Sequence, residues 1–444
     1  MRTIIRKSVA AAVAASTALG IGGISAISAG ASGSDGVTNN QITIGATVPL
    51  SGIASAGYSD VAKAANAVFK YVNAKGGVNG RKINFIIKDD CYGFPGAGCT
   101  GTPNTTTQTQ ALLNTPGGLF ATVGSLGTDT QKSVRNLLKS SGVPQLFVNS
   151  GSNDWNNPGT YPSLFGWQTD YVAEGKIFAN YIKTNYKGKK VGFIGQDDDF
   201  GQNGLVGLQR GGLPLSNIGS GDSFGYSALA AVLSDPFLTQ LTKLKNDGVQ
   251  VVVLDTIAQA TKKILTDAAN LKYKPVFIIS GVGSDPQTVN NKNEIGALTM
   301  TFFPATGDTK NSWNKWITKV LAADKADFPK FKSSTILTGN MQYGAGWAVT
   351  FLQLVKAMGS NVTQTNVVNT LENSGSTFAT PAITQLAYSA SNHQGLMGGI
   401  MVTVKSVTAT TPVKNAKVYA TTDADGSPLV VKNPVNAAVP AWLS

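Results

Sequence analysis

The chain has 444 residues, enough for two domains of ordinary size, and its 36 basic and 24 acidic residues give a net charge of +12. The basic residues are scattered, without a dense run or a nucleic-acid-binding motif, so we interpret them as solvated surface and expect no nucleic-acid partner. Beyond residues 1–31, no segment is long and apolar enough to span a bilayer.

Residues 1–31 have the pattern of a signal peptide. They begin with three basic residues, continue as a weakly apolar run, and end in Ala29-Gly30-Ala31, the small residues that signal peptidase reads. An uncleaved membrane anchor is the alternative, but the run holds few large aliphatic side chains. We therefore predict export to the periplasm, the cell surface or the medium. No cysteine directly follows the run, which argues against a lipid anchor on a new N-terminal cysteine.

The stretch from Gln41 to Asp90 predicts a strand, a loop, a helix and a second strand. Apolar residues alternate over 42–48 and 83–87, and between these strands an apolar stripe recurs at helical spacing until Gly76-Gly77. This is the opening unit of a parallel α/β sheet. Ligands of such sheets bind outside the carboxyl ends of the strands, so the loop at 51–60 is the first place to look for function.

The same alternation of strands and helices continues along the chain and implies parallel sheets. Further strands are expected at 119–123, 145–148, 190–194, 249–254 and 275–279, with more β structure over 400–404 and 413–421. Helices are expected at 128–140, at 171–183, from about Gly204, and at 235–246, 260–271, 313–321 and 343–358. The segment 100–109 is rich in Thr, Gly and Pro and is expected to be exposed.

Cys91 and Cys99 are the only two cysteines, and they bracket a Gly- and Pro-rich loop after the second strand. In an exported protein this arrangement predicts a disulfide. A metal or redox site of the CxxC kind requires closer spacing and more ligands. We predict no metal and no cofactor.

Four short motifs point to one family: TVPLSG at 47–52, YSD at 58–60, NAKGGVNGRKI at 73–83 and KDD at 88–90. They resemble the solute-binding proteins of branched-chain amino-acid ABC transporters, and the resemblance runs from about Gln41 to the end. It implies a type I periplasmic binding protein fold, in which two Rossmann-like α/β lobes with parallel sheets are joined by three crossing segments. It also implies a monomer that holds a small solute between its lobes and is recognised by a membrane ABC permease.

The resemblance also divides the chain. Lobe 1 is expected to comprise 41–165 and 307–388, and lobe 2 to comprise 170–303 and 398–444. The three crossings are expected at 161–170, 303–307 and 387–397.

One candidate ligand contact in lobe 1 is the turn GSLGTDTQ, which leads into the helix predicted from Thr128. Exposed N–H groups and the Thr128 hydroxyl suit a carboxylate or another acceptor, although a helix capped by Thr128 or Asp129 explains the turn equally well. A phosphate loop would need Gly-Lys-Ser/Thr, which is missing. The resemblance places the ligand contacts of lobe 1 on Gly127, Thr128, Ser150, Gly151 and Ser152, with Tyr58 as the loop aromatic that covers the ligand.

In lobe 2 the resemblance places ligand-facing residues at Phe200, Asp255 and Gly281. Phe200 belongs to the acidic run GQDDDFG, which lacks EF-hand spacing and therefore indicates a lip loop rather than a calcium site. Gly281 stands where the amino-acid binders carry an acid that pairs with the ligand's ammonium group. Only Asp255 or the run 197–199 is left to replace it, so we predict that leucine, isoleucine and valine bind poorly. The expected ligand is a small polar solute with a carboxylate or amide.

Two other functions compete with transport. Residues 221–225 match the G-x-S-x-G nucleophile elbow of serine hydrolases, but that motif needs a helix directly after the serine and a histidine base. The segment after Ser223 reads as a continuing strand, and the one histidine, His393, lies in a predicted crossing, so we expect no enzyme. A ligand-sensing receptor module of the same fold is the closer alternative, because fold alone does not separate sensing from transport.

Overall fold

The computed structural model describes residues 35–93, 98–99, 101, 103–213, 218–228, 237–435 and 437–444. The predicted signal peptide lies outside these residues. None of the helices in the described ranges combines the length and the apolar character needed to cross a membrane.

The first sheet is parallel throughout, with the strand order β2-β1-β3-β4-β5. Its strands are β1 (Gln41–Val48), β2 (Lys82–Asp89), β3 (Ala121–Val123), β4 (Gln145–Val148) and β5 (Leu164–Gly166). Seven of the eight residues of β1 are buried, as expected of a strand covered on both faces. Helix α1 (Ser55–Asn73) then buries its apolar stripe and ends before Gly76 and Gly77, which both have positive φ.

The second sheet is mixed, with the order β14-β13-β11-β10-β9-β8-β6-β7 and β12 beside β11. Its strands are β6 (Val191–Gln196), β7 (Ile218–Tyr226), β8 (Val251–Asp255), β9 (Val276–Ile279), β10 (Leu298–Thr301), β11 (Gly398–Ser406), β12 (Ala409–Pro412), β13 (Val418–Ala420) and β14 (Leu429–Val430). The pairs from β7 to β10 are parallel, whereas β11 to β14 pair antiparallel and extend one edge. The predicted α/β class is confirmed, since the first sheet and the β7-to-β10 part of the second sheet are parallel, whereas the antiparallel edge departs from the predicted parallel sheet.

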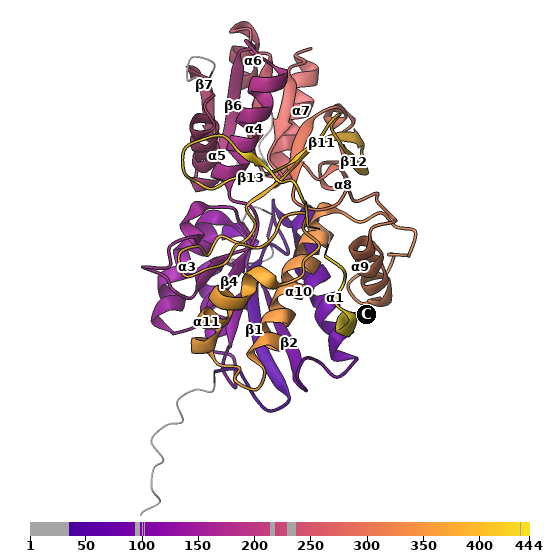
Figure 1. The fold of residues 1–444 in the computed structure, drawn as a ribbon. Coiled ribbons are helices and arrows are strands. Elements are labelled where there is room, and N and C mark those ends of the chain that lie inside the picture. Colours follow the sequence, from indigo (N-terminus) through magenta and orange to yellow (C-terminus); the bar gives the residue numbers. More distant parts are fainter. Residues whose placement is uncertain are drawn as a thin grey trace, which may run out of the picture. The chain divides into compact units, whose positions relative to one another are not determined.

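Helices connect the strands and cover the sheets (Figure 1). They are α2 (Thr105–Leu113), α3 (Thr128–Ser140), α4 (Tyr171–Asn185), α5 (Asp199–Arg210), α6 (Leu238–Asn246), α7 (Ala258–Asn270), α8 (Pro286–Val289), α9 (Ser312–Ala323), α10 (Gly339–Met358) and α11 (Gln364–Ser374). Helix α10 packs on α1, and side chains of both join β1 and β3 in one buried cluster. The chain after the second crossing therefore returns to the first sheet.

Trp167 is the point at which all three predicted crossings meet. Its ring lies 6.2 Å from that of Phe302 and 6.0 Å from that of Phe303, centroid to centroid, and its carbonyl accepts a hydrogen bond from Leu396 N at 2.9 Å. The indole N–H donates to Thr350 Oγ1 in α10. Trp167 is fully buried, so these contacts pack the three predicted crossing segments against one another.

The structure differs from the sequence predictions in several places, among them the unpredicted strands β5 and β10. The segment 100–109, expected to be exposed, contains the start of α2, whose Thr105 and Thr109 are buried. Helix α5 begins at Asp199 instead of near Gly204, because Asp198 caps it by accepting from Phe200 N. Helix α11 was not predicted. The last residues pack against α9, where Leu443 is buried, although the predicted division assigned 398–444 to lobe 2. The lobe boundaries stay a proposal.

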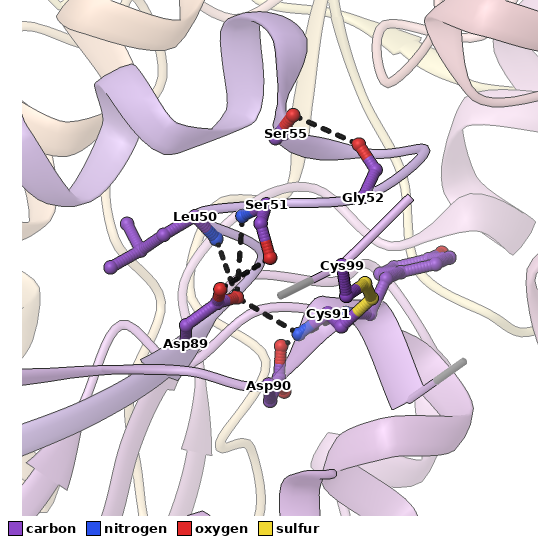
Figure 2. Close-up of a disulfide and its surroundings, with 9 residues drawn as sticks. Leu50, Ser51, Gly52, Ser55, Asp89, Asp90, Cys91 and Cys99 are labelled. Atoms are coloured by element: carbon purple, nitrogen blue, oxygen red, sulfur yellow. Dashed lines mark hydrogen bonds between the residues drawn. A yellow bond between two sulfur atoms is a disulfide. The ribbon is translucent and has the colours of Figure 1, made fainter. Parts of the chain in front are cut away.

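Cys91 and Cys99 form the predicted disulfide (Figure 2). Asp89, the last residue of β2, connects this region to the loop after β1, since its carboxylate accepts hydrogen bonds from Cys91 N and from Leu50 N, both at 3.0 Å. The disulfide thus constrains the chain after β2 directly beside the loop between β1 and α1.

We expect the Cys91→Ser/Cys99→Ser double variant to lower the free energy of unfolding by about 2–3 kcal/mol, because a short loop is no longer closed in the unfolded chain. Urea unfolding of both proteins measures the difference. Peptide mapping of exported protein without reduction should recover the two cysteines linked. Two free thiols, or equal stability of the two proteins, would contradict the prediction.

Candidate functional site

A small cavity of about 70 Å³ lies between the carboxyl ends of the two sheets. The first sheet's side contributes Tyr58, Tyr92, Leu126, Gly127, Thr128, Asn149, Asn340 and Tyr343. The first crossing contributes Gln168 and Thr169, and the second sheet's side contributes Tyr171, Glu174, Phe200, Ile257, Gly281, Val282, Met300 and Phe302. The lining is rich in aromatic rings and contains a single carboxylate.

The start of α3 forms one wall of the cavity. Gly127 precedes it with a φ of 112°, a conformation that favours glycine, and a Cβ there would lie 2.3 Å from Thr130 Oγ1. Among the described residues, no side chain caps α3, so its first-turn N–H groups are available to an acceptor. Beside them, Asn149 Nδ2 is buried and has no hydrogen-bond partner in the described part of the chain. This wall offers neutral donors.

The aromatic residues close the cavity from both sides. The Tyr58 hydroxyl donates to Val282 O at 2.8 Å and accepts from Ala258 N at 3.1 Å, so a side chain from the start of α1 is held by two turns of the second sheet. Phe200 packs on Tyr171 with 4.5 Å between ring centroids. Burial raises the pKa of both Tyr58 and Tyr171, which keeps these phenols neutral.

Glu174 supplies the one carboxylate of the lining. It lies in the first turn of α4, only 4% exposed, and accepts hydrogen bonds from Gly281 N at 2.8 Å and from Ser280 Oγ at 2.7 Å. Burial raises its pKa to about 7, and these two hydrogen bonds oppose the rise. The sequence analysis missed this residue. The sequence feature that could have indicated it is a single acidic residue among the buried, mostly apolar residues of α4.

Five of the nine predicted ligand-facing residues line the cavity: Tyr58, Gly127, Thr128, Phe200 and Gly281. The other four lie behind it. The Ser150 hydroxyl is 2.8 Å from Thr128 Oγ1, Gly151 O accepts from Tyr171 N, and the Ser152 hydroxyl accepts from Asp154 N. Asp255 is buried against Gly204 in α5, whose Cβ, if present, would lie 1.4 Å from Asp255 Oδ2. Their role as ligand contacts stays a prediction.

The acidic run after β6 forms a lip between the two sides of the molecule. Asp198 caps α5, and Asp199 pairs with Lys132 of α3, which also lies 3.1 Å from Asp154. Asn153 N donates to Asn203 Oδ1 beside this ion pair. These contacts hold the second sheet's side against the first in the observed arrangement.

The hydrolase motif does not form a nucleophile elbow. Ser223 lies inside β7, whereas the motif requires a sharp turn from a strand into a helix. The ring nitrogens of His393 contact Leu164 O at 2.9 Å and Glu372 Oε1 at 3.1 Å, and the ring stacks on Phe165. This histidine is a structural part of the crossing region.

A wider recess of about 600 Å³ adjoins the cavity and shares Tyr92 with it. Its rim includes Gly93 and Ala228, and each of these is followed in the chain by residues outside the described ranges. We therefore assign no site to it.

Comparison with known proteins gives one family. The model of the periplasmic binding protein family matches residues 41–410. Leu/Ile/Val-binding protein homolog 3 of Brucella melitensis is 26% identical over 212 residues, which cover 48% of this chain and 53% of that protein. The chain thus matches about half the length of this curated relative.

Solved structures share the fold at low sequence identity. A possible leucine/isoleucine/valine-binding protein from Rhodopirellula baltica has a TM-score of 0.69 and 15% identity, with 85% of this chain and 97% of that chain covered. A branched-chain amino acid ABC transporter protein from Thermus thermophilus with bound valine has a TM-score of 0.69 and 16% identity, with coverages of 92% and 98%. A fatty acid ABC transporter substrate-binding protein from Thermomonospora curvata has a TM-score of 0.64 and 16% identity, with coverages of 92% and 95%.

Proposed function

Because this chain belongs to the periplasmic binding protein family, a family of extracytoplasmic substrate-binding proteins and not of enzymes, we propose that it delivers a solute to an ABC importer. The solute is small and polar, an amino acid, an amide or a carboxylate, and it binds between the two lobes. A membrane permease recognises the form in which the lobes have closed over it. The observation that carries this proposal is the buried, aromatic-lined cavity between the carboxyl ends of the two sheets.

The α3 wall supports a carboxylate or amide as the group bound by lobe 1. The uncapped N–H groups of α3, the Thr128 hydroxyl and the unpartnered Asn149 amide all present hydrogen-bond donors without a full positive charge. Neutral donors suit a carboxylate or carbonyl oxygen better than a phosphate dianion. At the opposite side, Tyr58 bridges the lobes above the cavity, so lobe separation must break its two hydrogen bonds before a solute enters.

We expect Thr128→Val to weaken solute binding by roughly 1–3 kcal/mol, because it leaves a buried polar group of the ligand without a partner. Calorimetry with a panel of amino acids, amides and carboxylic acids measures this loss. Mass spectrometry of denatured protein identifies any co-purified solute, which then joins the panel. The control is Thr184→Val, whose hydroxyl bonds only Asn180 O on an exposed helix face among the contacts described. Unchanged affinity in Thr128→Val would place the ligand elsewhere.

A further inference from the structure

The charge balance of the cavity is incomplete. Glu174 lines it, 96% buried, and the lining residues in the described part of the chain include no lysine, arginine or histidine. Its two hydrogen-bond donors in the described chain, Gly281 N and Ser280 Oγ, are neutral and bind one oxygen each. Burying an ionised carboxylate costs free energy unless a positively charged group pairs with it.

A second feature of the lining also indicates a missing partner. The Tyr343 hydroxyl, in α10, is buried without a hydrogen-bond partner in the described chain, and Tyr343 is only 6% exposed. Together with Tyr58, Tyr171 and Phe200 it lines the same cavity as Glu174. Aromatic faces attract cations, and the attraction is stronger in a site that excludes water. The rings and the carboxylate therefore favour the same kind of ligand group.

We propose that Glu174 is the residue of this chain that selects a ligand carrying a positively charged nitrogen, as a protonated or methylated amine. This inference rests on the proposed function and names the chemistry of its ligand. Glu174 takes the place of the acid that is missing at Gly281: a Cβ on that glycine would lie only 3.4 Å from Glu174 Oε1, so the carboxylate occupies the space beside the turn. Poor binding of simple amino acids was predicted because no acid stands at Gly281 to pair with the ammonium group of the ligand. Glu174 provides such an acid.

The test compares solutes that differ only in the charged nitrogen. Calorimetry of the full chain uses leucine with isocaproate, phenylalanine with hydrocinnamate, and glycine betaine with tert-butylacetate. In the pair that binds, we expect the cationic member to bind at least about tenfold more tightly to the native protein. Glu174→Gln keeps the shape and an acceptor oxygen but removes the charge, so this preference should fall to about twofold or less.

The matched control is Glu294→Gln, which removes another buried carboxylate from the second sheet's side, outside the cavity lining. It should retain the preference for the cationic member. A further readout is the pH profile: the preference should grow from about pH 6 to about pH 8 in the native protein and stay flat in Glu174→Gln, since only an ionised Glu174 attracts a cation. The other titratable groups of the cavity lining are the phenols of Tyr58, Tyr92, Tyr171 and Tyr343, and Asp255 from β8, behind the lining, interacts electrostatically with Glu174.

Two outcomes would overturn the inference and leave the proposed function standing. The first is that the native protein binds the two members of a pair, with and without the charged nitrogen, with equal affinity. The second is that Glu174→Gln keeps the preference for the cationic member. Failure of every panel member to bind, together with no co-purified solute in the denatured protein, would instead remove the proposed function and this inference with it.

Discussion

Replacing Gly344 by valine is expected to prevent folding, or to lower the free energy of unfolding by roughly 3–5 kcal/mol. Gly344 lies in α10 where that helix crosses α1, and a Cβ at this position would be 2.0 Å from Val61 O. The obstructing atom belongs to the backbone, so no side-chain rotation relieves the clash. The two helices would have to separate, which would open the main buried cluster of the first sheet.

The measurement is urea unfolding, followed by far-UV circular dichroism, of the native chain and the variant. Gly159→Val is the matched control, because a Cβ at Gly159 would meet no heavy atom within 4 Å. It should unfold at nearly the native urea concentration. If Gly344→Val and Gly159→Val had the same midpoint, the close approach of α1 and α10 would be refuted.

The sequence predicted most of the strands because the strands of parallel sheets are buried on both faces and read as apolar runs. Val251–Asp255 and Gln145–Val148 show this clearly, since every residue in them is buried. The same reasoning missed α2. Two of its three buried residues are threonines, Thr105 and Thr109. The buried face of α2 therefore does not appear in the sequence as a repeat of apolar residues at helical spacing.

The turns of the candidate site were predicted, and five of the nine predicted residues line the cavity, but the placement of Asp255 and the presence of Glu174 were not predicted. The end of β8 is at Asp255 as expected, yet its carboxylate lies against Gly204 of a neighbouring helix, a space that exists only because that residue is glycine. Glu174 was not predicted as a site residue, because its place in the cavity depends on tertiary packing. Helix α4 was predicted, but its contact with the turn at Gly281 was not. That contact depends on how segments distant in the sequence pack together, which the sequence alone does not show.

Glu294 leads to the second large expected effect, a stability that depends on pH. Its side chain is 1% exposed, and both carboxylate oxygens are buried without a hydrogen-bond partner in the described chain. Burial, followed by the nearby negative charge of Asp285, raises its pKa from 4.5 to about 8. The folded protein therefore keeps this proton over a range in which the unfolded chain releases it. The contribution of Glu294 to stability is therefore most favourable below about pH 4.5 and is lost as the pH rises to about 8.

Glu294→Gln removes this ionisation, so we expect the variant to be more stable than the native chain by roughly 4 kcal/mol at about pH 8, since each unit of pKa corresponds to about 1.4 kcal/mol. At about pH 5 the two proteins should differ by less than about 1 kcal/mol, because Glu294 is then almost neutral in the folded state and only partly ionised in the unfolded chain. Urea unfolding at both pH values measures the difference. Asp425→Asn, which changes a side chain that is 90% exposed, should show no such dependence. A gain of equal size at both pH values would mean that packing, and not the charge of a buried carboxylate, sets the stability here.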